Sequence, residues 1–146
     1  MTNHIFANTI QKTNEVLVDL EKELDWIGQR KKAYALLRST LHALRDRLPV
    51  FEAVEFGAQL TLLLRGVYYD GWKPSQVPLK MHKDEFLMHI ESQFQFDLEI
   101  PVEKAVAAVF SVLKMHMDPD EMEKIEKILP KNFSQLFKEY YGRVIA

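Results

Sequence analysis

The chain contains no cysteine. This absence excludes disulfides, a catalytic thiolate, iron–sulfur clusters and cysteine-based zinc sites. No apolar run approaches the roughly 18 residues that a membrane-spanning helix requires. The N-terminus also lacks a basic segment followed by an apolar one and a small-residue cleavage site, so we see no secretion signal. We therefore expect a cytoplasmic protein without a membrane partner.

The motifs of the common catalytic classes are missing as well. The five glycines are scattered, so the chain has no glycine-rich phosphate loop, and no Gly-x-Ser-x-Gly elbow occurs. The five histidines include no His-Glu-x-x-His or His-x-His pair. We expect no catalytic residue, no metal and no cofactor. An enzyme or small-ligand binder with an unrecognised site stays open as an alternative.

Apolar spacing and helix breakers predict helices along the whole chain. Leucines at helical spacing mark one face over residues 37–48. Pro49 ends that helix and begins another, in which Gly57 allows a neighbouring helix to approach closely. Thr61 can cap the next helix through its hydroxyl. The pair Asp70–Gly71 ends that helix, because glycine readily adopts the left-handed conformation.

The N-terminal segment carries an apolar seam with alternating steps of four and three residues. Its members are Phe6, Ile10, Thr13, Leu17, Leu20, Leu24 and Ile27. Such a seam fits a coiled-coil dimer, but it also fits a long helix that packs along its own domain and ends at Gly28. Three heptads that include a threonine are marginal for a coiled coil. The second interpretation is therefore favoured, and with it a monomer over a dimer.

The second half of the chain resembles the first in its order of helices and breakers. The segment that begins at Asn14 (NEVLVDLEKEL) corresponds to the one that begins at Asp84 (DEFLMHIESQF). The segment from Ala33 (AYALLRSTL) likewise corresponds to the one from Ala105 (AVAAVFSVL). Identity between the halves is low, so the repeated order is what indicates an internal repeat.

These patterns predict the fold class. A chain of 146 residues is expected to form a single domain, 1–146. We predict an all-α fold of two pseudo-repeated four-helix units, spanning about 14–69 and 84–141, packed as one helical domain. A proline-containing loop, 70–82, links them. The final helix is expected to present its apolar face over residues 133–140.

Almost the whole chain resembles a known family. The string LRSTLHALRDRLPVFEAVEFGAQL, followed by LLRGVYYDGW, is similar to the first half of a small bacterial helical family, domain of unknown function 2267. The resemblance extends from about Phe6 to Phe137. Thr61 stands where the family usually has proline after the leucine. The resemblance implies a helical fold and a bacterial origin, and it supplies no activity.

Positive charge is concentrated in residues 30–47, which hold six basic side chains and one acid, although the whole chain has a net charge of −2. This segment could bind an anion or, weakly, a nucleic acid. The alternative is structural, because Arg45 and Arg47 lie at a helix C-terminus, where positive charge is favoured. The acidic remainder of the chain opposes a polyanion, so we do not expect nucleic acid binding.

Aromatic residues and arginines near the Asp70–Gly71 stop form the candidate partner surface. Its members are Arg45, Arg47, Arg65, Tyr68, Tyr69 and Trp72. Adjacent tyrosines lie about 100° apart on a helix, so both cannot face the same core, and such residue types anchor interfaces. We therefore predict a non-catalytic protein-interaction module. The structural alternative is that Trp72 seals the joint between the two units while one tyrosine caps the core.

His116 stands apart from the other histidines. It follows Val109, Val112 and Leu113 on an apolar face. This position predicts substantial burial with a hydrogen-bond partner on at least one ring nitrogen. A pH-sensitive switch residue is the alternative.

Overall fold

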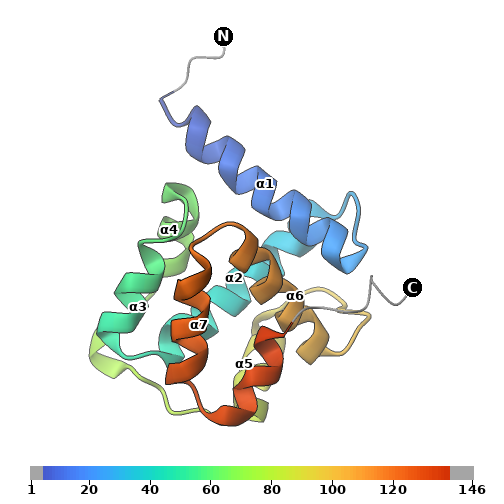
Figure 1. Ribbon diagram of the computed structural model, residues 1–146. Coiled ribbons are helices and arrows are strands. Elements are labelled where there is room, and N and C mark those ends of the chain that lie inside the picture. The colour runs from blue at the N-terminus through green and yellow to red at the C-terminus, as the bar shows by residue number, and fades with distance from the viewer. Residues whose placement is uncertain (1–4, 139–146) are drawn as a thin grey trace.

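The computed structural model describes residues 5–138, and over these residues it contains α-helices, two short 3₁₀ helices and no strand (Figure 1). The elements are α1 (Ala7–Leu24), α2 (Arg30–Arg47), α3 (Val50–Gly57), α4 (Leu62–Tyr69), η1 (Pro74–Gln76), α5 (Lys83–Gln93), α6 (Val102–Met115), α7 (Pro119–Ile128) and η2 (Lys131–Phe137). The all-helical prediction is confirmed for this part of the chain. None of its helices is long and apolar enough to span a lipid bilayer.

Most helix boundaries follow the local signals in the sequence. Pro49 is the N-cap of α3, and the Thr61 hydroxyl accepts a hydrogen bond from the backbone N–H three residues later, at 3.2 Å, at the start of α4. The first helix ends before Gly28, because Asp25 itself adopts the left-handed conformation with φ 58°. Local capping chemistry therefore accounts for the start of α4, and one left-handed residue accounts for the early end of α1.

The helices pack around α2, which contacts α1, α3, α4, α5 and α6. The first helix of each half packs against the second helix of the other half: α1 lies on α6, and α5 lies on α2. One cluster of buried apolar side chains draws members from all seven α-helices and from η2. The two halves of the sequence therefore share a single core.

The final segment differs from the prediction. Residues 131–137 form the 3₁₀ helix η2 in place of an α-helix. Phe133 and Leu136 are buried and Phe137 packs against the core, whereas Tyr140 lies outside the described residues. A 3₁₀ helix has three residues per turn, so the spacing from Phe133 to Leu136 places both side chains on one face.

The central and C-terminal part of the apolar seam of α1 packs against the rest of the same chain. Thr13, Leu17, Leu20 and Leu24 are buried against the rest of the domain, while Phe6, Ile10 and Ile27 are 48%, 42% and 66% exposed. Figure 1 shows that the first turns of α1 extend beyond the body of the molecule, while Ile27 lies after the end of this helix at Leu24. The helix thus packs along its own domain from Thr13 onward.

The predicted burial of His116 is wrong. The residue is exposed and is the C-cap of α6, with φ −109° and ψ 7°. It therefore lies beyond the last helical turn and leaves the apolar face that Val109 and Leu113 continue. The predicted hydrogen bond is present, because Nε2 lies 2.7 Å from a carboxylate oxygen of Asp19.

Gly57, the last residue of α3, lies against two tyrosines of α4. A Cβ atom at this position would lie 2.6 Å from the Tyr69 hydroxyl oxygen and 2.9 Å from a ring carbon of Tyr68. Tyr68 is fully buried and cannot shift freely. At Gly66, in the middle of α4, an added Cβ would meet no atom within 4 Å. The two glycines therefore provide a matched pair.

We expect Gly57→Ala to lower the free energy of unfolding by about 1–3 kcal/mol, because the added methyl overpacks the contact with the tyrosines. Gly66→Ala should raise that free energy by about 0.5–1 kcal/mol, because alanine favours the helix and no neighbour obstructs it. Urea-induced unfolding of both variants would measure these changes. Equal effects of the two substitutions would contradict the close-approach role of Gly57.

Candidate functional site

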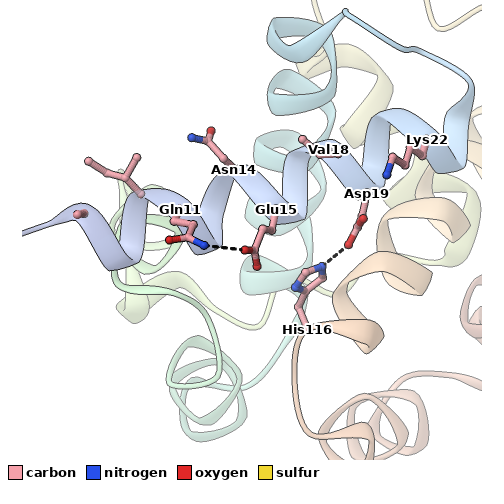
Figure 2. Close-up of a pocket in the computed structure, with 9 residues that line it drawn as sticks. Gln11, Asn14, Glu15, Val18, Asp19, Lys22 and His116 are labelled. Atoms are coloured by element: carbon pink, nitrogen blue, oxygen red, sulfur yellow. Dashed lines mark hydrogen bonds and ion pairs between the residues drawn. The ribbon is translucent and has the colours of Figure 1, made fainter. Parts of the chain in front are cut away.

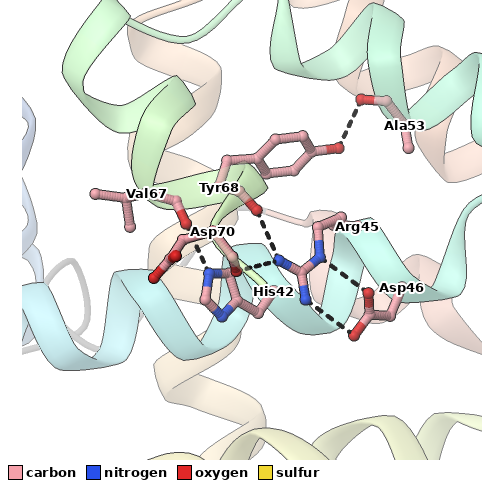
Figure 3. Close-up of polar contacts among 7 residues, drawn as sticks. All are labelled: His42, Arg45, Asp46, Ala53, Val67, Tyr68 and Asp70. Carbon is pink, nitrogen blue, oxygen red and sulfur yellow. Dashed lines mark hydrogen bonds and ion pairs between the residues drawn. The ribbon is translucent and has the colours of Figure 1, made fainter. Parts of the chain in front are cut away.

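Arg45 is the centre of a buried polar network (Figure 3). Its side chain is 6% exposed, and its Nε and Nη2 atoms donate to the two carboxylate oxygens of Asp46 at 2.9 and 3.2 Å. Nη1 donates to the backbone oxygens of Tyr68 and Asp70, both at 2.9 Å. The guanidinium thus joins α2 to the C-terminus of α4, whose last carbonyls would otherwise lack partners.

The other two predicted arginines also bind backbone carbonyls. Arg65 donates from Nε and Nη2 to three carbonyl oxygens at the end of α3 and just after it. Arg47 donates to the Met81 oxygen at 2.9 Å and lies 5.7 Å from the centre of the Phe133 ring. Burial lowers the pKa of the Arg47 guanidinium. Arg47 therefore faces the second half of the chain, away from the α3–α4 junction.

The predicted aromatic residues form a continuous row with Phe56. Successive ring centres from Phe56 through Tyr68 and Tyr69 to Trp72 are 5.7, 5.0 and 5.3 Å apart. Tyr68 is fully buried, its hydroxyl donates to the Ala53 oxygen at 2.6 Å, and burial raises its pKa. Tyr69 and Trp72 are half-buried against the core. The structure thus brings these aromatics and Arg45 together, and their role in binding a partner stays a prediction.

We expect Arg45→Met to lower the free energy of unfolding by about 3 kcal/mol, because it leaves Asp46 and two carbonyl oxygens without their donor in a buried place. Arg38→Met is the control on the same helix. Arg38 pairs with Asp70 at 2.9 Å, but the two side chains are 40% and 68% exposed. Loss of that pair should cost about 0–1 kcal/mol. Chemical unfolding would measure both, and a small effect at Arg45 would contradict its central role.

The positive charge of residues 30–47 is mostly neutralised inside the fold. Four of its cations have carboxylate partners: Arg30 with Glu21, Lys32 with Glu99, Arg38 with Asp70 and Arg45 with Asp46. Arg47 binds a carbonyl oxygen. Lys31 is exposed and has no partner within residues 5–138. Most cations of the segment are therefore paired, and the exposed ones are Arg30, which is bound to Glu21, Lys31, and Arg38, which is bound to Asp70.

Lys31 and Arg38 lie in a groove that sequence reasoning missed, the α2–α5 groove, which has a volume of about 660 Å³. Its lining includes Lys31, Tyr34, Arg38, His42, Gln93 and Phe96. The α2 residues fall at steps of three and four, so they share one helix face. The helical spacing was visible in the sequence, but the second wall comes from α5 and the segment after it. Only their packing on α2 forms the groove.

His42 connects this groove to α4 (Figure 3). Its Nε2 atom lies 2.7 Å from the Val67 carbonyl oxygen. A carbonyl oxygen can only accept, so Nε2 carries the proton. Burial lowers the pKa of His42 most, and the nearby Arg45 and Arg38 lower it further, while the Val67 hydrogen bond and Asp46 oppose the shift. At neutral pH the ring is uncharged, and its Nδ1 atom is a hydrogen-bond acceptor.

The lowered pKa of His42 predicts a pH-dependent stability. In the unfolded chain the pKa of the ring is about 6.5. As pH falls through this value, the unfolded state therefore binds the proton more readily than the folded state. The free energy of unfolding therefore falls with decreasing pH. His42→Gln retains a donor for Val67 but does not titrate. We expect the free energy of unfolding of the wild type, relative to that of this variant, to decrease below about pH 6.5. Urea unfolding across the weakly acidic range would measure this difference.

All other ionisable groups are the same in both chains, so the difference between wild type and His42→Gln isolates the effect of His42. A difference that stays constant with pH would contradict the assignment.

A second groove, of about 800 Å³, runs along the outer side of α1 (Figure 2). Its lining includes Ile10, Glu15, Val18, Asp19 and His116. The hydrogen bond between His116 and Asp19 ties the end of α6 to α1 and forms one edge of the groove. The polar groups are spread along the helix and do not converge on one point. Within residues 5–138, no group of three or more histidine or acidic side chains is placed to bind a metal ion.

A third accessible feature is an apolar stripe on α3, the α3 stripe, formed by Val50, Phe51 and Val54, which are 42%, 67% and 45% exposed. The opposite side of this helix is buried. Glu55 pairs with Lys124 of α7 at 3.1 Å, which places α7 beside α3. An apolar stripe is thus left in contact with solvent beside a charged pair.

Comparison with known proteins places this architecture in a family. The family described as "Uncharacterized conserved protein (DUF2267)" matches residues 13–136. The chain belongs to the DUF2267 family. The resemblance predicted from the sequence is therefore confirmed, while the description carries no activity. No curated protein matches the chain. In this DUF2267 chain the match begins at Thr13, the first buried residue of α1, and ends in η2 at Leu136.

Proposed function

We propose that this DUF2267 chain is a non-catalytic interaction module of a bacterial cytoplasm that binds a partner protein through the α3 stripe. The observation that carries this proposal is the exposure of the stripe. Phe51 is 67% exposed on a helix whose other face is buried in the core. Burying a phenylalanine side chain is worth about 1.5–3 kcal/mol, so a partner that covers this ring gains binding energy from it.

The stripe continues onto α7. Phe51 lies one turn before Glu55, and Ile128 lies one turn after Lys124, the ion-pair partner of Glu55. Because α3 and α7 run in opposite directions (Figure 1), Phe51 and Ile128 lie at the same end of this ion pair. Ile128 is 38% exposed. The apolar surface thereby extends over two helices, as a docking surface for a helical segment would require.

The charges beside the stripe favour one class of partner. Glu52 has no ion pair among the described residues, and Glu55 forms an ion pair with Lys124. The α3 face therefore combines apolar contacts with an acidic residue. A partner segment with an apolar face and flanking lysine or arginine residues complements both.

Two finer predictions join this proposal. A partner could reach the six-residue surface predicted from the sequence through Arg65, Tyr69 and Trp72, which are half-buried, whereas Arg45 and Tyr68 are covered. In both halves the first helix packs on the second helix of the other half, α1 on α6 and α5 on α2. This reciprocal packing supports the proposal that the two halves are repeats. We further propose that the free chain is a monomer.

A direct test uses two synthetic amphipathic helical peptides with the same leucine face, one flanked by lysines and one by glutamates. The lysine-flanked peptide should bind more tightly. The double variant Phe51→Gln/Val54→Gln should weaken it by about tenfold or more, because it removes the apolar anchors. Met88→Gln on α5, where Met88 is 65% exposed, is the matched control and should leave binding unchanged. Exposed substitutions of this kind change stability by about 0.5 kcal/mol or less, so all variants should fold.

Equal binding of the peptide by the double variant would overturn the proposal. Sedimentation of the wild type and of the double variant distinguishes a partner protein from a second copy of this chain as the occupant of the α3 stripe. Concentration-dependent self-association that the double variant abolishes would assign the α3 stripe to a second copy of the chain and reject a heterologous partner.

A further inference from the structure

The α2–α5 groove has features of a ligand site that the proposed interaction function does not use. We propose that it binds a small anionic ligand that carries a planar aromatic ring, of the mononucleotide class. Its volume of about 660 Å³ lies in the range of small-molecule sites. The groove also lies on different helices from the α3 stripe, so the two proposals can be tested separately.

The cations come from one face of α2. Lys31 is the single cation of residues 30–47 without a partner inside residues 5–138. Arg38 pairs with Asp70, but this pair is well exposed and contributes little, so its guanidinium can still donate to an anion. The two residues are about two helical turns apart and bracket the turn that carries Tyr34. A phosphate above this turn is within the range of both flexible side chains.

The aromatic walls lie on both sides of the groove. Tyr34 of α2 is 38% exposed, and Phe96, which follows α5, is 48% exposed. Stacking of a nucleobase on an aromatic side chain is worth about 1–3 kcal/mol. Gln93 and Gln95 also line the groove, and their amides have no hydrogen-bond partner within the described residues. Each amide offers donors and an acceptor for the edge of a base.

Repulsion of an anion is small in this groove. Asp46 is the carboxylate of the lining, and both its oxygens accept hydrogen bonds from Arg45. His42 holds its Nε2 proton toward Val67, so its Nδ1 atom offers an acceptor for an N–H or O–H group of the ligand. His89 lines the α5 wall and has no side-chain partner within residues 5–138. The site therefore offers cations, ring faces and both kinds of hydrogen-bonding group.

The experiment is an NMR titration of the ¹⁵N-labelled full chain with adenosine monophosphate, inorganic phosphate and adenosine in separate arms. Adenosine monophosphate should give saturable shifts at groove residues and bind about tenfold or more tightly than either fragment, since it combines charge and stacking. Binding should weaken as salt is raised. Lys31→Gln and Tyr34→Ala should each reduce affinity about tenfold. Lys114→Gln, an exposed lysine on α6, is the matched control and should not.

Several outcomes would overturn the proposal. Absence of saturable shifts at the groove would reject the site, and equal affinity for inorganic phosphate would reduce it to a simple anion site. Binding of a single-stranded oligonucleotide without binding of the mononucleotide would assign the groove to nucleic acid instead. Unfolding curves check that the variants fold. Because neither substituted residue lies on α3, these results are independent of the peptide-binding test.

Discussion

The guanidinium of Arg45 holds the first half of the fold together. Four hydrogen bonds use most of its five N–H groups and connect α2 with the end of α4. The same end of α4 carries Tyr68, whose hydroxyl binds Ala53 of α3, and whose ring requires the missing side chain of Gly57. A buried guanidinium without these acceptors would be costly. Together with the His42–Val67 hydrogen bond, the Arg45 contacts fix α4 on α2, and Tyr68 carries this connection on to α3.

Several charged side chains of this protein make contacts within the fold. The buried Glu21 carboxylate binds Arg30, and hydrogen bonds from Arg30 and from the Gly28 backbone lower its pKa despite its burial. Lys32 is buried, pairs with Glu99 and lies 4.2 Å from the centre of the Trp26 ring. Each of these pairs compensates one buried charge with a more exposed partner. Of the exposed cations on α2, Arg30 is bound to the buried Glu21, whereas Lys31 and Arg38 line the α2–α5 groove.

The accessible features lie on a fold whose core is shared between both halves. Because α1 packs on α6 and α5 on α2, neither half can separate without exposing the interior. The α3 stripe and the α2–α5 groove are built on helices that this packing holds in place. Both lie within residues 13–136, the segment that matches the DUF2267 family. Binding at either surface is therefore expected to require little rearrangement of the backbone.

Local signals in the sequence determined the helical class, the breaker at Pro49 and the cap at Thr61, because these depend on nearby backbone sterics and hydrogen bonds. These signals did not predict the exposure of His116. This residue lies just beyond the last turn of α6, and there the apolar spacing no longer places a side chain in the core. The hydrogen bonds from Arg38 to Asp70 and between His116 and Asp19 join residues 32 and 97 positions apart. Only the tertiary structure decided which charges stay accessible and where two helices form a groove, because those contacts come from packing between distant segments.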